Sequence, residues 1–208
     1  MAGWNKFAAG QHWSAKIIIT VLLTVLFAGT AGAGNTYGTK KTEGSFAPLK
    51  GMTAFGYAED WSQLLINGME VSDWLDYRQF EQPEYDAKKE LETELKPSIK
   101  NLREALNEKL GGHIRFTPGK AQTYKLTISP LNIDKKGNMI LECVFSDNSG
   151  NQVVKFYVSG RGGTFGSMSN LWGDGFGSAG RRLAKRLINE LLPDQKTSKK
   201  LADFIDNL

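Results

Sequence analysis

The chain has 208 residues, of which 40% are hydrophobic and 23% charged, with 26 Lys and Arg against 22 Asp and Glu. A charge balance this close to neutral argues against a dedicated nucleic-acid-binding protein, which normally carries strong basicity. A single cysteine and two histidines exclude an intramolecular disulfide and a zinc site built from cysteine and histidine.

The N-terminal segment has the three parts of a secretory signal peptide. Lys6 and Lys16 precede an apolar run over residues 17–28, and the small residues of Ala31-Gly-Ala33 follow it. The run is shorter than the roughly 20 apolar residues of a membrane span. We therefore expect a signal peptide over 1–33 and an exported protein, periplasmic or associated with the outer membrane. An uncleaved signal anchor in the inner membrane is the alternative.

The next segments lead into the folded part of the chain. Residues 34–50 are rich in Gly, Thr, Lys and Ser and are predicted to be a flexible lead-in. A single globular domain is expected over 51–208. Its first strand is predicted at Met52–Tyr57, and Leu64–Ile66 is either a short strand or the end of a turn.

A helical pattern follows over residues 72–110. Pro83 interrupts it, and the stretch over 85–95 resumes it with closely spaced Lys and Glu. Pro97 fits the first turn of a last helix, where its missing N–H costs nothing. Gly111 and the glycine after it are expected to end that helix.

Three strands are then predicted from a period of two, over 124–128, 139–146 and 153–159. The connections between them are short, which favours an antiparallel meander. Cys143 lies on the apolar face of the second strand and is expected to be a buried, inert thiol.

After a glycine-rich loop, helices are predicted over 178–192 and 201–208. Helices before and after a meander predict an α+β domain. We expect a two-layer sandwich, in which a mixed or mainly antiparallel sheet of about four strands is packed by helices.

The glycine-rich loop contains Gly175-Phe-Gly-Ser-Ala-Gly180, which matches G-x-G-x-x-G. A dinucleotide site needs these glycines directly after a strand, with an acidic residue about 20 positions later. Here a long loop separates them from the preceding strand, so nucleotide binding is not expected.

Large apolar residues in the same loop are unusual for a plain linker, and a basic helix face follows them. Either the apolar side chains cover an edge of the core, or they are exposed and contact a membrane interface or a partner. The cations are either a solvated helix face or a patch for an anionic surface or acidic partner. The candidate contact residues are Arg161, Phe165, Trp172, Phe176, Arg181, Arg182, Lys185 and Arg186.

Carboxylates and aromatic residues alternate between Glu59 and Glu84. Two carboxylates flanked by aromatic side chains are typical of a sugar-cleaving cleft. The same residues also fit a solvated helix surface, with Trp74, Tyr77 and Phe80 as a packing stripe.

Residues 120–192 resemble a domain family of unknown function found in exported bacterial proteins and lipoproteins. The resemblance rests on Tyr124-Lys-Leu-Thr-Ile128, on the stretch Cys143 to Val153, on Gly160-Arg-Gly-Gly163 and on the helix from Ala179. That family is similar in fold to the amino-terminal domain of the Tol-Pal translocation protein and to the curli-secretion lipoprotein. The resemblance implies a mixed α/β layer and a non-enzymatic role in the envelope. This chain lacks the acylated cysteine of the lipoprotein members.

The sequence therefore predicts an exported, non-catalytic binding or scaffold module that uses residues 160–186 to contact an envelope protein or an anionic envelope surface. A secreted hydrolase using carboxylates between Glu59 and Glu84 is the alternative. No cofactor, metal, nucleotide or nucleic acid is expected to bind.

Overall fold

The computed structural model describes residues 42–119 and 122–192, which belong to one compact unit. The predicted signal peptide over 1–33 and the predicted closing helix over 201–208 lie outside the described residues. Residues 42–50, expected as part of a lead-in, form a strand and a 3₁₀ turn instead.

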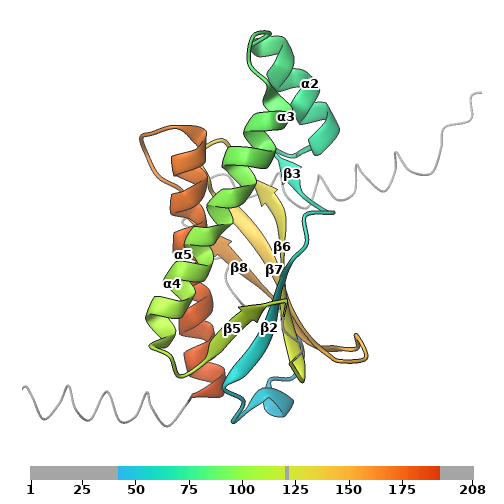
Figure 1. The fold of residues 1–208 in the computed structure, drawn as a ribbon, viewed down its shortest axis with the longest axis vertical. Coiled ribbons are helices and arrows are strands. Elements are labelled where there is room, and N and C mark those ends of the chain that lie inside the picture. Colours follow the sequence, from blue (N-terminus) through green and yellow to red (C-terminus); the bar gives the residue numbers. More distant parts are fainter. Residues whose placement is uncertain (1–41, 120–121, 193–208) are drawn as a thin grey trace, which may run out of the picture. The chain divides into compact units, whose positions relative to one another are not determined.

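An eight-stranded mixed sheet lies at the centre of the domain (Figure 1). Its main path runs β1-β8-β7-β6-β2-β5, and β3 pairs with both β6 and β4. Strand β2 is parallel to β5 and to β6, whereas β6, β7 and β8 form an antiparallel meander. The strands are β1 (Thr42–Gly44), β2 (Ala54–Glu59), β3 (Leu65–Ile66), β4 (Met69–Glu70), β5 (Arg115–Pro118), β6 (Tyr124–Ile133), β7 (Met139–Asp147) and β8 (Gln152–Gly160).

The prediction of a sandwich with about four strands is wrong, although the α+β class stands. The antiparallel meander is confirmed. It could be predicted because its strands are long enough to show an alternating pattern. Strands β1, β3, β4 and β5 have only two to four residues, which is too short for such a pattern. Strand β5 also pairs in parallel with β2 only after the chain has passed through several helices, a contact that local sequence does not encode.

The helices are α2 (Val71–Glu81), α3 (Ala87–Glu90), the π turn η2 (Leu91–Leu95), the 3₁₀ turn η3 (Lys96–Ile99), α4 (Lys100–Leu110) and α5 (Met168–Leu191), with a further 3₁₀ turn, η1 (Ala47–Leu49), after β1. The segments from α3 to α4 follow one another without a break, so the chain passes through Pro97 instead of starting a helix there. Proline lacks the N–H that an α-helix requires, and the change to π and 3₁₀ geometry accommodates it. Gly111 ends α4 in a left-handed conformation with φ 56°, as predicted.

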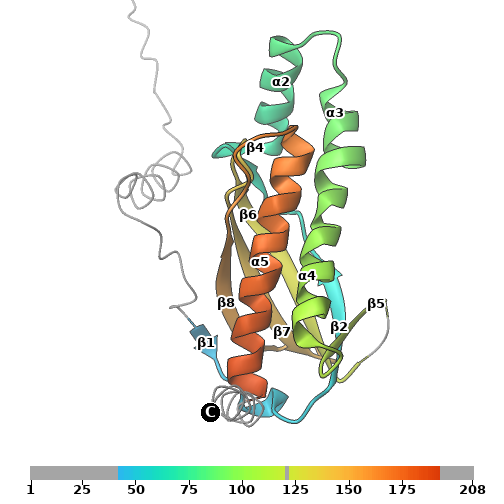
Figure 2. The ribbon, with the colours of Figure 1, turned by 90° about the vertical axis from the view of Figure 1, so that its left-hand side faces the viewer.

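Helices α4 and α5 lie side by side over one face of the sheet (Figure 2). The core forms between them and the strands, and it includes Phe46 and Leu49 from the segment next to β1. Cys143 is buried there, as predicted, and burial raises the pKa of its thiol above the usual value. Across 42–119 and 122–192, no helix has the length and apolar character needed to cross a bilayer.

Helix α5 starts at Met168, so the prediction of a start near Ser178 is wrong. The glycines of the G-x-G-x-x-G match lie inside this helix and are buried. A Cβ at Gly175 would collide with the carbonyl oxygen of Gly137, and one at Gly180 with that of Leu102. The motif therefore lets α5 approach α4 and the β6–β7 turn closely, and it is not a phosphate-binding loop.

These contacts predict opposite effects for two neighbouring substitutions. Gly180→Ala is expected to lower the free energy of unfolding by about 1–3 kcal/mol, because the new methyl group overpacks the α4–α5 contact. Gly177→Ala is the matched control, since its Cβ would meet only the Arg181 guanidinium at 3.6 Å. There, alanine is expected to be neutral or to stabilise by up to about 1 kcal/mol. Urea unfolding of both variants measures the difference, and equal stabilities would contradict the close approach.

Candidate functional site

The start of α5 is fixed by a side-chain cap. Ser167 Oγ accepts a hydrogen bond from the backbone N–H of Asn170 at 3.3 Å, which satisfies one of the free donors of the first turn. The loop before it is tied to the β6–β7 turn, because the N–H of Gly162 donates to Asn138 Oδ1 at 3.2 Å. The sequence signal that indicates this start, and that the prediction of a start near Ser178 did not use, is a serine followed by apolar residues at helical spacing, Met168, Leu171 and Trp172.

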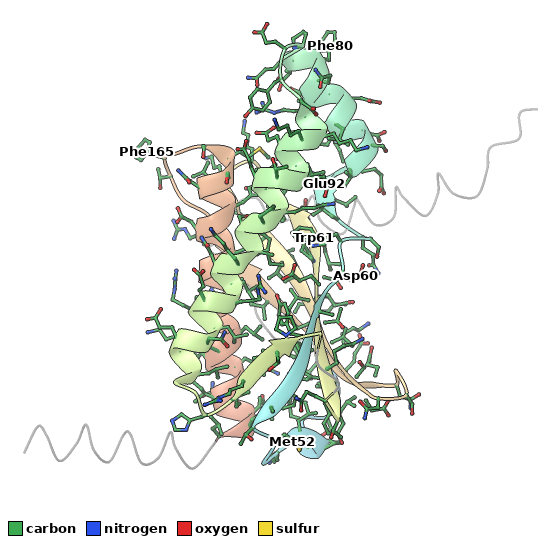
Figure 3. All side chains as sticks on the ribbon, in the orientation of Figure 1. Met52, Asp60, Trp61, Phe80, Glu92 and Phe165 are labelled. Carbon is green, nitrogen blue, oxygen red and sulfur yellow. The ribbon has the colours of Figure 1, made fainter. Side chains whose placement is uncertain are left out.

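The predicted apolar contact residues separate into two groups. Trp172 and Phe176 are both 0% exposed, and the ring of Phe176 packs edge-on against Trp61 at a centroid distance of 6.1 Å. These two side chains are part of the core and are not available to a partner in this structure. Phe165 is 90% exposed and points away from the domain at the turn before α5 (Figure 3).

Two of the predicted cations attach α5 to the edge of the sheet. Arg182 Nη1 donates to the carbonyl oxygen of Ser159 at 3.1 Å and also to its hydroxyl. Arg186 Nη2 donates to Thr42 Oγ1 at 2.8 Å, and its Nε lies 3.2 Å from Glu190. The Arg186 guanidinium also stacks over Phe156 at 5.7 Å, so it joins α5 to β1 and β8.

The other predicted cations are exposed. The guanidinium groups of Arg161 and Arg181 form no ion pair or hydrogen bond with residues 42–119 or 122–192, and Lys185 is exposed on the same helix. Arg161 and Arg181 line a cavity of about 510 Å³ between α4 and α5.

A second cavity of about 690 Å³ continues the first toward η2 and is lined by Phe165. The two share Asn101, Gly173 and Asp174, and together they form what we call the α4–α5 groove. Its lining carries both signs of charge, since Glu104 and Asp174 lie beside the arginines.

Glycines make room for the polar side chains of the groove. A Cβ at Gly163 would collide with the Asp174 carboxylate, and one at Gly173 would lie 2.6 Å from Asn101 Nδ2. Asn101 and Asp174 therefore rest directly on glycine backbone. The result is a groove lined by polar side chains.

The carboxylates between Glu59 and Glu84 do not gather at one place. Glu59 lies 3.8 Å from Arg103 Nε, at the end of β2. The backbone N–H of Ser62 donates to Asp60 and holds the pKa of that carboxyl below its usual value. The remaining acids, Glu70, Asp73, Asp76, Glu81 and Glu84, are exposed on β4, on α2 and in the loop after it. This distribution favours the solvated surface over a cleft with two opposed carboxylates.

The expected packing stripe of Trp74, Tyr77 and Phe80 does not form. Trp74 is 2% exposed, whereas Tyr77 and Phe80 are 47% and 84% exposed. Positions 74, 77 and 80 spread too far around a helix to share one face. In the part of the chain that the structure describes, no group of three or more His, Cys, Asp or Glu residues could hold a metal ion.

No protein-family model matches the chain, and no curated protein matches it. Among solved structures, it is similar to the dodecamer of a single-residue variant of PelC from Paraburkholderia phytofirmans, with 11% identity and a TM-score of 0.36 over 71% of this chain and 98% of that one. A second structure, the PelC dodecamer from the same organism, has 12% identity and a TM-score of 0.34 over 69% of this chain and 95% of that one. Similarities this weak establish neither a shared fold nor a shared activity.

The two kinds of arginine predict different effects on stability. Arg186→Ala is expected to lower the free energy of unfolding by about 1–2 kcal/mol, because it removes the Thr42 hydrogen bond and the stacking on phenylalanine. Arg181→Ala is expected to change it by less than about 0.5 kcal/mol. Thermal unfolding of the two variants side by side tests this assignment. An Arg181 variant as unstable as the Arg186 variant would place Arg181 in the fold as well.

Proposed function

We propose that this chain is an exported, envelope-associated protein that acts as a non-catalytic binding module. Its contact surface is the exposed part of residues 160–186, namely Arg161, Phe165, Arg181 and Lys185, together with the α4–α5 groove. The observation that carries the proposal is Phe165, a large apolar side chain that is 90% exposed at the border of a polar groove. Aromatic side chains of this kind provide much of the binding energy at protein interfaces.

The charges of the groove favour a protein partner over an anionic envelope surface. Glu104, Glu108 and Asp174 line the same cavity as the two arginines. Carboxylates at this position would repel phosphate headgroups, whereas a polypeptide can match both signs of charge. An anionic surface remains an outcome of the test below.

Export is proposed from the N-terminal segment, whose basic leader, apolar run and small-residue site fit a cleaved signal. The test expresses the full chain in a Gram-negative host, fractionates the cells and sequences the N-terminus of the recovered protein. We expect a start near Gly34 and recovery with the envelope. An intact Met1 in the inner membrane would show an anchored protein instead.

The contact surface is tested by substitution in the same experiment. The double variant Arg161→Glu, Arg181→Glu and the single variant Phe165→Ser are each expected to reduce retention on envelope material at least about tenfold, with unchanged thermal unfolding. Lys125→Glu, an exposed charge reversal on β6, is the control and is expected to be retained like the wild type.

Two outcomes would contradict the proposal for this surface. Retention of both variants at the wild-type level would remove residues 160–186 from the contact. Binding of the purified wild type to phosphatidylglycerol vesicles, lost in the arginine variant, would show that the partner is an anionic surface and not a protein.

A further inference from the structure

Helix α2 has apolar side chains on two different faces. Trp74 is buried on the inner face, at 2% exposure. On the outer face, Asp73, Asp76, Tyr77 and Phe80 follow one another at positions i, i+3, i+4 and i+7 and are all exposed. Phe80 is 84% exposed and lies near the outer end of the helix (Figure 3). The outer face therefore combines acidic and aromatic side chains along about 10 Å of helix.

The hairpin formed by α2, its loop and α3 is held together by hydrogen bonds that do not involve Phe80. Arg78 binds Glu90 through two hydrogen bonds, of 3.1 and 3.2 Å. Gln79 Nε2 donates to the carbonyl oxygen of Pro83 at 2.8 Å, and Asp86 caps α3 by accepting from the N–H of Lys89. The fold thus has no need for an aromatic residue at position 80, and the surface is preorganised for a partner.

The hairpin is also negatively charged where its aromatic residues are exposed. Residues 73–86 contain five carboxylates and one cation, Arg78, whose charge is paired with Glu90. Tyr85 is 40% exposed in the same hairpin, and the Arg78 guanidinium lies over its ring at 5.6 Å. The lysines that follow, Lys88 and Lys89, lie on α3, so the negative charge belongs to α2 and its loop.

We infer that the outer face of this hairpin is a docking surface for a basic, apolar segment of another protein. Cations of that segment would pair with Asp73 and Asp76, and its apolar side chains would pack on Tyr77 and Phe80. The carboxylates disfavour an anionic lipid surface by like-charge repulsion. This surface is separate from the α4–α5 groove, and the inference stands whether or not the proposed function is correct.

The test measures binding of a fluorescent amphipathic peptide of leucine and lysine to the full chain, by anisotropy. We expect saturable binding that weakens as salt is added, because screening acts on the exposed charges. Replacing every lysine of the peptide with glutamate, or every leucine with serine, is expected to weaken binding at least about tenfold. The first change tests the charge of the occupant and the second its apolar anchors.

Variants of the chain locate the site. Phe80→Ser and the pair Asp73→Asn, Asp76→Asn are each expected to weaken peptide binding at least about tenfold, with unchanged thermal unfolding. The matched control is Asn148→Lys with Ser149→Lys, at two exposed positions in the turn between β7 and β8, which makes the same change in net charge and is expected to leave the affinity within about twofold.

Each of the following results would overturn the inference. One is that the wild type fails to bind the leucine–lysine peptide, or that the serine peptide binds equally well. Another is that binding is lost in a Glu104→Lys, Glu108→Lys variant on α4 and kept in the Phe80 variant, which would assign the peptide to the groove. A third is that the wild type self-associates in sedimentation and that Phe80→Ser abolishes this association, which would make a second copy of the chain the occupant.

Discussion

The close approach of α5 to its neighbours is the constraint on which the rest of the described structure depends. Two glycines of this helix lie directly against backbone, Gly175 against the β6–β7 turn and Gly180 against α4. A side chain at either position would push the helix outward. Because the helix lies so close, its register is fixed, and Trp172 and Phe176 are sealed into the core.

The same register distributes the cations of α5 between structure and surface. Arg182 and Arg186, four residues apart, both lie toward β8 and β1, where they bind Ser159 and Thr42. Arg181 lies toward the groove with α4. The basic residues of α5 therefore form two sets: Arg182 and Arg186 attach the helix to the sheet, whereas Arg181 lines the groove.

The sequence predicted the elements whose signal is local. Strands β7 and β8 alternate over most of their nine residues, and α4 has an apolar face and a glycine stop, so these elements were predictable. Strand β6 alternates only up to Ile128, so its continuation to Ile133 was not predicted. The short parallel strand β5 was not, because its pairing with β2 is decided by tertiary contacts. The first half of α5 was missed because glycine has low helix propensity, and packing overrides propensity here.

The candidate site was predictable to a similar extent. Phe165 and the exposed arginines were found from composition, since apolar and basic residues are unusual in a glycine-rich segment. The groove was not, because it depends on Gly173 of α5 facing Asn101 of α4 and on Gly163 of the preceding loop facing Asp174. Nor was the exposure of Phe80, because only the structure shows which face of α2 is covered.

Phe80 and Phe165 are both exposed phenylalanines, but their electrostatic settings differ. Burying a phenylalanine contributes about 1.5–3 kcal/mol, and neither of these two residues gains it within the described domain. Both lie near turns whose geometry is set by hydrogen bonds, at Pro83 and at Gly162, so neither aromatic ring is needed for local structure. A polar residue would serve the isolated fold equally well. The groove beside Phe165 carries both signs of charge, whereas the hairpin beside Phe80 is acidic, so the two surfaces suit two different contacts.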